Sequence, residues 1–372
     1  MKTLDRYIAR NFIVGYLISF SVLMGLCIVV DVFVNVDEWA ENVDRGLLPL
    51  VIRLGQFYGS RVALWFRDMA GMVTVIAAVF SLTRMTRNNE LIAVMASGVS
   101  LKRIIAPILF LALFLTGLQV IDQELIIPRL AQQLTYTHDY VPGQRRYRMW
   151  FASDSFGHLI STPSYHEENQ TMDHPFFVLR WKDPETQRWV VTGQVQAQSA
   201  QYDYDRKGWI LQDGRRLDFK VEDDRFAGNE LGPVEFIQSD LDPVQVPLRH
   251  QKGFVSLLSS MQVENLIRSP GTRPTDLAEL YLQKHVRITD PLINLIMLMV
   301  ALPVLVCRDP RDMKSAIMTS FMITSACFIT TFLCKLFATE VFFHQVRPEL
   351  WAWLPVFIFL PIAFLQIDSM KT

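Results

Sequence analysis

Six apolar stretches constrain this chain more than any other feature of its sequence. They fall into two groups of three, separated by a long polar segment, and cover residues 12–34, 62–83, 103–127, 288–306, 315–338 and 350–367. A helix needs about 20 mostly apolar residues to cross the hydrocarbon core of a bilayer. The first stretch is too long for a signal-peptide core and has no small-x-small cleavage site before Asp37. The sequence therefore predicts a multi-pass, α-helical membrane protein whose first span is retained.

Composition indicates a chain that is part membrane and part water-exposed. Of its 372 residues 51% are hydrophobic, and the mean hydropathy of +0.21 is high for a soluble protein but low for spanning helices alone. A formal net charge of −1, without a basic and aromatic patch, argues against nucleic-acid binding. The polar segment has no cysteine and therefore no disulfide framework, because all four cysteines fall in apolar stretches: Cys27, Cys307, Cys327 and Cys334.

Lysine and arginine residues gather on one side of the predicted spans, which is the cytoplasmic side in membrane proteins. They precede the first span, follow the sixth, and occupy the loops after the second and fourth, whereas carboxylates follow the first. We therefore expect both termini to be cytoplasmic and the polar segment to lie outside. The basic residues are Lys2, Arg6, Arg10, Arg84, Arg87, Lys102, Arg103, Arg308, Arg311, Lys314 and Lys371, and the acidic ones are Asp37, Glu38, Glu41 and Asp44.

The polar segment alternates short β-rich runs with turn-forming residues from about residue 147 to 247. Strands at this spacing, with no helical period between them, predict an all-β sandwich or jelly roll. Asp213-Gly214 within GWILQDGRRLDF favours a hairpin. The HEE at 166–168 lacks the second histidine of a zinc-protease helix, which favours a surface turn. The predicted domains are 1–130 with three spans, 131–253 with the β-domain, 254–286 as a helical connector, and 287–372 with three spans.

The loop between the second and third spans, RMTRNNELIAVMASGVSLKR, predicts a short amphipathic helix over residues 88–98. Asn88 can cap its start, and Glu90 then lies in the first turn, where a carboxylate suits the positive end of the helix dipole. Gly98 is a stop signal, and Ser100 can cap the next helix. Apolar residues at helical spacing form one stripe along it: Leu91, Ile92, Val94, Met95 and Val99.

The residues alone leave two interpretations of this loop open. The helix can rest on the inner lipid leaflet, its basic flanks paired with anionic headgroups. Alternatively, it is a coupling helix that docks into a groove on a soluble ATPase, where its carboxylate meets a basic surface. The chain has no G-x-x-x-x-G-K-[ST] phosphate-binding loop, so an ATPase that drives it has to be another chain.

Two motifs resemble the LptF/LptG family of lipopolysaccharide-export permeases: LDRYIARNF near the N-terminus and RMTRNNELIAVMASGVSLKRIIAP in the loop. VQAQSAQYDYDRKGWIL is similar to the family's periplasmic β-jellyroll, and the order of three spans, β-domain and three spans is also the family's. The LDRYI motif leans towards LptG. The resemblance implies an inner-membrane permease without a cofactor or a metal, which passes lipopolysaccharide towards an LptC/LptA-type periplasmic bridge. It also implies a second LptF/LptG-type permease and an LptB-type ATPase dimer as partners.

The resemblance also implies roles for residues of the loop. Glu90 matches the family's coupling-helix glutamate, and other positions match the motif around it: Arg87, Asn89, Leu91, Met95, Ser97 and Gly98. The chain departs from the family in the outer part of the first span, where LptG-type members carry basic residues that meet lipid phosphates. This chain has only Asp31 there, and its second span reads WFRDMAG instead of a proline-containing apolar stretch.

Ionisable residues within spans are costly and need a partner or a function. Asp31, Arg61, Arg67, Asp68 and Lys335 all map to the outer third of the membrane. In one interpretation they form pairs across helices, such as Asp31 with Arg67 or Asp68 with Lys335, because neighbours like Arg67 and Asp68 do not face each other on a helix. In the other, Arg61, Arg67 and Lys335 line a cavity that holds an anionic lipid headgroup.

Three functions compete on this sequence. The first is a transporter permease that moves a large amphiphile and relies on a separate ATPase. The second is a membrane-anchored binding or scaffold protein, and the third is an intramembrane enzyme. Six spans exceed what an anchor needs, and no catalytic pair is recognisable at membrane depth. The sequence favours the permease, which is not itself an enzyme.

Overall fold

The computed structural model describes residues 3–37, 47–134, 146–183, 185, 189–222, 225–243, 245–246, 253–268, 274–306, 313–339 and 347–369. The chain divides into two compact units. We call Met1–Arg129 with Tyr281–Thr372 the helical unit and Leu130–Leu280 the β unit. Several residues used above to predict orientation or cysteine chemistry lie outside the described residues: Lys2, Glu38, Glu41, Asp44, Cys307, Arg308, Arg311 and Lys371.

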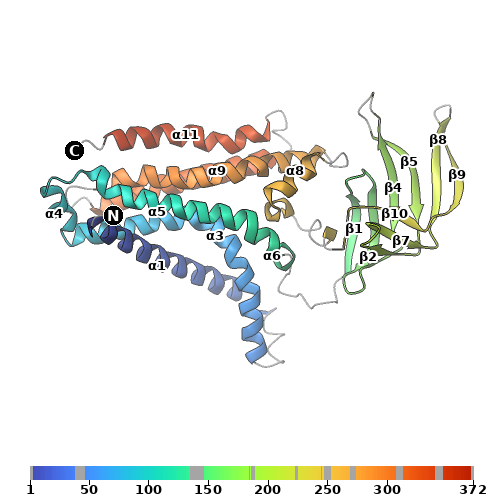
Figure 1. Cartoon of the computed structure of the whole chain (residues 1–372), viewed down its shortest axis with the longest axis horizontal. Helices are drawn as coiled ribbons and strands as arrows, with labels where there is room; N and C mark the ends of the chain where they lie inside the picture. The colour runs from blue at the N-terminus through green and yellow to red at the C-terminus, as the bar shows by residue number, and fades with distance from the viewer. Residues whose placement is uncertain are drawn as a thin grey trace. The chain divides into compact units, whose positions relative to one another are not determined.

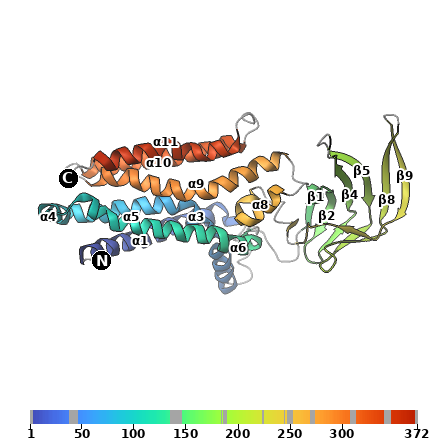
Figure 2. The ribbon, with the colours of Figure 1, turned by 45° about the horizontal axis from the view of Figure 1, so that its top comes forward.

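The helical unit consists of long helices that run side by side, with a short helix, α4, at one end (Figure 1, Figure 2). Its elements are α1 (Thr3–Val34), α3 (Leu47–Arg87), α4 (Glu90–Ala96), α5 (Leu101–Ile121), η2 (Asp122–Ile126), α6 (Ile127–Leu134), α9 (Pro274–Leu305), α10 (Met313–Thr339) and α11 (Pro348–Ser369), of which α6 and α9 extend into the β unit.

Six helices among the described residues are long and apolar enough to cross a membrane, which confirms the predicted spans. They are Thr3–Val34, Leu54–Arg87, Leu101–Ala131, Leu277–Leu305, Lys314–Ala338 and Pro348–Asp368. We call the end of the helical unit where α1 starts and α4 lies the α4 end. At the opposite end, α1 and α10 finish and α11 begins.

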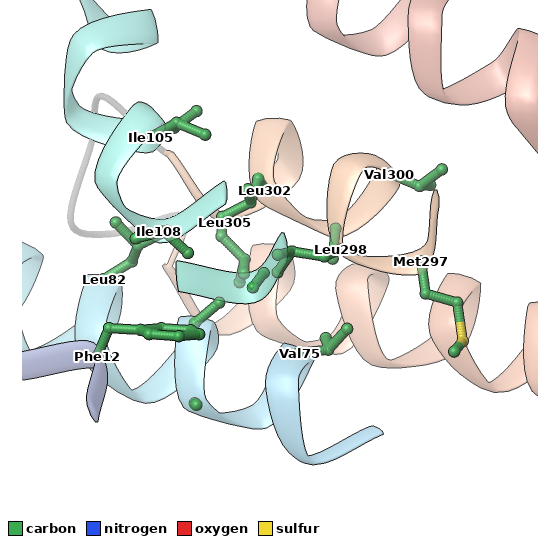
Figure 3. Close-up of a cluster of buried hydrophobic side chains, with 14 of the residues drawn as sticks. Phe12, Val75, Leu82, Ile105, Ile108, Met297, Leu298, Val300, Leu302 and Leu305 are labelled. Carbon is green, nitrogen blue, oxygen red and sulfur yellow. The ribbon is translucent and has the colours of Figure 1, made fainter. Parts of the chain in front are cut away.

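The helical unit has one large apolar core in which α1, α3, α5 and α9 meet (Figure 3). Lipid tails are as apolar as these side chains, so close packing rather than water exclusion holds such helices together. Gly71 of α3 permits one close approach, because a Cβ there would overlap the side chains of Asn294 and Met297 on α9. Fully buried core residues come from all four helices: Phe12, Leu82, Ile108 and Leu298.

The third span is interrupted by a single π-helical turn, η2, between α5 and α6. A π turn accommodates an extra residue in a helix and often lies at functional positions. Asp122 and Gln123 in this turn are buried. The apolar pattern of the span did not reveal the turn.

The described strands of the β unit form one antiparallel sheet in the order β10-β7-β6-β3-β2-β4-β5-β8-β9, with β1 paired to β2. This confirms the all-β prediction. The largest buried side chains also satisfy their polar atoms, since Trp209 Nε1 donates to the Leu241 carbonyl at 3.1 Å. The strands are β1 (Arg146–Ser153), β2 (Leu159–His166), β3 (Thr171–Asp173), β4 (Phe176–Lys182), β5 (Trp189–Gln196), β6 (Ser199–Asp203), β7 (Gly208–Gln212), β8 (Arg215–Glu222), β9 (Arg225–Pro233) and β10 (Phe236–Gln238).

The predicted hairpin at Asp213-Gly214 is wrong. Strand β7 pairs with β6 and β10, whereas β8 pairs with β5 and β9, so neither has an edge left for the other. Asp213 does adopt a positive φ of 51°, as Asp-Gly sequences favour. A Cβ at Gly214 would overlap the Val234 carbonyl, so glycine is needed where the chain passes this strand end.

The HEE sequence forms a surface turn, as predicted. His166 ends β2, the following residues turn, and β3 begins at Thr171. His166 Nε2 lies 2.6 Å from Asp173 Oδ2, so its imidazole contacts the neighbouring strand. The predicted connector contains η3 (Phe254–Leu257), α8 (Ser260–Arg268) and the start of α9.

Candidate functional site

The predicted loop helix is present but shorter than expected. It is α4, Glu90–Ala96, and its N-cap is Asn89 in the left-handed region at φ 59°, without a side-chain cap. The prediction that Asn88 caps it is wrong, because the Asn88 N–H donates to the Arg84 carbonyl and so still belongs to the end of α3. A left-handed asparagine after a helix is a usual C-terminal stop. The two asparagines thus end one helix and start the next within a single turn.

The end of α4 follows the prediction more closely. Gly98 has a φ of 80°, and its N–H donates to the Met95 carbonyl, which closes the helix. The Ser97 hydroxyl donates to the Val94 carbonyl at 2.7 Å. Ser100 is the residue before α5, but its side chain makes no capping bond. The turn between the two helices is therefore closed by main-chain geometry.

Four of the five residues of the predicted apolar stripe face the core of their own unit, whereas Ile92 is half-buried and is not among the residues packed against that core. Leu91 is fully buried in the core cluster, and Val94, Met95 and Val99 pack against it. The outward positions carry small or polar side chains, and among the described residues no large exposed apolar side chain lies between Phe80 and Phe110. The exposed residues of the loop are Arg84, Arg87, Asn88, Asn89, Ala93, Ala96, Ser97, Gly98, Lys102 and Arg103.

Glu90 is bound on both oxygens. The Tyr7 hydroxyl of α1 donates to Glu90 Oε2 at 2.8 Å, and Asn88 Nδ2 donates to Glu90 Oε1 at 3.2 Å. The carboxylate at the start of α4 is thereby tied to the first turns of α1. Sequence reasoning identified Glu90 but missed Tyr7, although Tyr7 lies within the quoted N-terminal motif.

Asp31 and Lys335 at the opposite end each contact a residue that was not among the predicted partners. Asp31 Oδ2 accepts from the Tyr58 hydroxyl at 2.7 Å, and Lys335 Nζ lies 2.7 Å from Asp290 Oδ2. The prediction that Arg67 and Asp68 do not meet is wrong, since Arg67 Nε lies 2.8 Å from Asp68 Oδ1. The long arginine side chain turns back along its own helix to reach its neighbour.

Two of the proposed headgroup cations make further contacts. Arg67 Nη1 donates to Gln123 at 3.2 Å, and the Arg61 guanidinium lies 4.0 Å from the centre of the Phe57 ring.

A polar network joins α3, α5 with its π turn, and α9, and sequence reasoning missed it. Asn294 Nδ2 donates to Gln119 Oε1 at 2.8 Å, and Gln119 Nε2 donates to the Arg67 carbonyl at 3.0 Å. Arg287, only 5% exposed, pairs with Glu124 at 3.4 Å. Polar residues inside the third and fourth spans were the signal available in the sequence.

An apolar cavity of about 310 Å3 lies between α3, α9 and α10. None of the three predicted headgroup cations is among its lining residues. Its walls include Met72, Val75, Val79, Met297, Phe321 and Phe328. A space of this kind suits an acyl chain rather than a headgroup.

A shallow pocket of about 270 Å3 lies on the β unit, lined by Phe156, Tyr202 and Tyr204 together with Asp240 and Asp242. Burial, and then the carboxylates of Asp242 and Asp240, raise the pKa of Tyr202. These carboxylates also accept main-chain N–H bonds, as Asp240 Oδ1 does from Ser155 at 2.8 Å. They therefore help to hold the loops at this end of the sheet.

The chain has three spans, a β unit and three further spans, with a packed helix in the loop between the second and third spans. The sequence profile described as lipopolysaccharide export system permease LptF/LptG matches residues 6–367. The chain belongs to the LptF/LptG family. The match covers nearly the whole chain and does not separate LptF from LptG, so the leaning towards LptG stays a prediction. A search of curated proteins found no match.

Family membership fixes the coarse role of this LptF/LptG chain. It is a multi-pass inner-membrane protein and a permease component of a lipopolysaccharide export system, with a β domain that fits a periplasmic jelly roll. The family is a transporter component rather than an enzyme family. The match by itself assigns no role to Glu90 or to the charged residues at the opposite end.

Proposed function

We propose that this chain extracts lipopolysaccharide from the inner membrane and passes it to an LptC/LptA-type periplasmic bridge. An LptB-type ATPase dimer docks at the α4 end and drives the step, and a second LptF/LptG-type permease completes the transporter. Both termini lie in the cytoplasm and the β-domain in the periplasm, with boundaries at 1–130, 131–253, 254–286 and 287–372.

The observation that carries this proposal is the packing of α4. A helix that rests on lipid presents its apolar stripe to the membrane. Leu91 and Met95 instead face the core of the unit, and the exposed face carries small, polar and basic residues. Such a face supports contact with a protein surface over burial in lipid. In this proposal Arg87, Asn89, Ser97 and Gly98 contribute to the docking surface, and Leu91 and Met95 fix the helix beneath it.

The substrate sites are proposed at the opposite end and along α10. The apolar cavity between α3, α9 and α10 accommodates part of an acyl chain. Of the three cations Arg61, Arg67 and Lys335, we favour Lys335 for the anionic headgroup. It lies on the helix that lines this cavity, and its side chain is 36% exposed, compared with 18% for Arg67.

The test is to purify the chain from native membranes and ask whether an ATPase is retained. We expect the unmutated chain to retain it and Glu90→Lys to lose it, because the substitution reverses the charge at the start of α4. Glu349→Lys, in the first turn of α11 at the opposite end, is the matched control and should retain the ATPase.

Absence of an ATPase from the unmutated preparation would favour the alternative function, a membrane-anchored periplasmic binding or scaffold protein without transport activity. Retention of the ATPase by Glu90→Lys would argue against docking at α4, even if transport itself were confirmed.

A further inference from the structure

The two halves of α1 differ in how they are held. The half nearest α4 carries the buried residues Ile8, Phe12 and Tyr16, and a Cβ at Gly15 would lie 3.2 Å from the Ala77 carbonyl of α3. From Gly25 to Val34 no residue is buried. The first half of α1 is thus rooted in the helical unit, whereas the second half has little packing of its own.

Tyr7 connects the rooted half of α1 to α4. Tyr7 is 39% exposed, so it contributes little to the core, yet its hydroxyl donates to Glu90 Oε2 at 2.8 Å. Asn88 occupies the other carboxylate oxygen. A carboxylate held on both oxygens has one fixed direction, and hydrogen bonds to charged groups are stronger than those between neutral groups.

Helix α1 contains a second tyrosine, Tyr16, whose hydroxyl differs from that of Tyr7. Tyr16 lies about two and a half turns further along the same helix and is buried, but its hydroxyl has no hydrogen-bond partner among the described residues. The exposed tyrosine therefore makes the bond between helices, and the buried one does not. A buried hydroxyl usually has a hydrogen-bond partner and an exposed one can bond to water, so the bond made by Tyr7 is not explained by burial.

We propose that Tyr7 is a positioning residue that orients Glu90 and links α4 to α1. This inference rests on the proposed function, in which an ATPase docks at α4. Movement of α4 on docking would reach α1 through the Tyr7–Glu90 bond. Because the second half of α1 is sparsely packed, a displacement at its root would move that half against its neighbours.

The experiment compares Tyr7→Phe with Tyr16→Phe in proteoliposomes that contain the purified transporter and lipopolysaccharide. Three quantities are measured: the amount of ATPase retained, the rate of ATP hydrolysis, and the lipopolysaccharide released per ATP hydrolysed. Tyr7→Phe keeps the ring and removes the donor, and we expect it to lower the release per ATP roughly three- to tenfold, as for the loss of about one net hydrogen bond. Tyr16→Phe should leave this ratio unchanged.

Glu90→Gln separates positioning from charge. Its amide oxygen can still accept from Tyr7, so release per ATP should fall less than in Tyr7→Phe, while the amount of ATPase retained should fall more. The double variant Tyr7→Phe/Glu90→Gln should show a smaller combined loss than the sum of the two, because both act through one bond.

The outcomes are distinguishable. If Tyr7→Phe releases as much lipopolysaccharide per ATP as the unmutated chain, the link through Tyr7 is overturned and the proposed docking stands. If Tyr7→Phe and Tyr16→Phe lower the ratio equally, the effect is a general weakening of α1 and the inference is also overturned. If the unmutated chain retains no ATPase, the proposed function fails and this inference fails with it.

Discussion

The two ends of the helical unit each have a carboxylate that accepts from a tyrosine hydroxyl, Glu90 at one end and Asp31 at the other, but they differ in how their cations are paired. At the α4 end, neutral donors hold the carboxylate of Glu90 beside an exposed face of small, polar and basic residues. At the opposite end, cations meet carboxylates between helices, as Arg287 does with Glu124 and Lys335 with Asp290. One end presents polar groups outward, and the other pairs its charges within the unit, as a membrane requires.

The largest expected effect at the opposite end comes from Arg287→Ala. The Arg287 side chain is 5% exposed and that of Glu124 is 30% exposed, so removing the cation from this partly buried ion pair should cost about 2 kcal/mol. We expect a lower midpoint in thermal unfolding of the detergent-purified chain. Arg268→Ala is the control, since its pair with Glu264 is exposed and is worth less than about 1 kcal/mol.

A double replacement tests the reason for that loss. Arg287→Met with Glu124→Leu removes both charges and fills similar volume, so stability should return towards that of the unmutated chain. If Arg287→Ala and Arg268→Ala had equal midpoints of thermal unfolding, the stability of the opposite end would not depend on its internal ion pairs. The proposed difference between the two ends would then be wrong.

Lys335→Ala is expected to change lipid contact more than stability. The side chain of Lys335 is 36% exposed, and such a pair contributes less than about 1 kcal/mol. If Lys335 meets an anionic headgroup, crosslinking of lipopolysaccharide to a probe on α10 should fall roughly tenfold, the change expected for one charged hydrogen bond. Lys314→Ala, near the start of α10 at the α4 end, is the control and should leave crosslinking unchanged. Undiminished crosslinking in both Lys335→Ala and Lys335→Glu would remove Lys335 from the substrate site.

The sequence predicted most reliably those features that depend on neighbouring residues. Length and apolar content predicted all six spans, and the period of Leu91, Val94 and Met95 predicted a helix with a buried stripe. The left-handed conformation at Gly98 was predictable because few other residues adopt it readily. The sequence did not predict whether the stripe packs against lipid, a partner protein or the chain's own core, because the same apolar pattern is compatible with all three.

Contacts between distant elements were the part that sequence reasoning missed. Asp213-Gly214 predicts a positive φ, which Asp213 adopts. The strand that pairs with β7 could not be predicted locally, because both edges of β7 are occupied by the distant strands β6 and β10. A tyrosine in the first turns of a span is typical of a membrane interface, so the bond from Tyr7 to Glu90 left no local signal. The pairing of Arg67 with Asp68 was excluded on helix spacing alone, which neglects the length of the arginine side chain.

The smallest expected effect, and the one that most sharpens the comparison, comes from Tyr58→Phe. The Tyr58 hydroxyl donates to Asp31 Oδ2 at 2.7 Å and joins α3 to the sparsely packed half of α1. Its loss should cost about 1 kcal/mol. We expect normal ATPase retention but faster labelling of a cysteine introduced at Val30, because the second half of α1 then separates from α3 more often. The same cysteine in the Tyr7→Phe chain should label at nearly the unmutated rate in the absence of ATP, since the rooted half of α1 keeps its packing. If Tyr58→Phe instead reduced lipopolysaccharide release per ATP as strongly as Tyr7→Phe, the bond at either end of α1 would serve the same purpose, and the α4 end would have no special part in coupling.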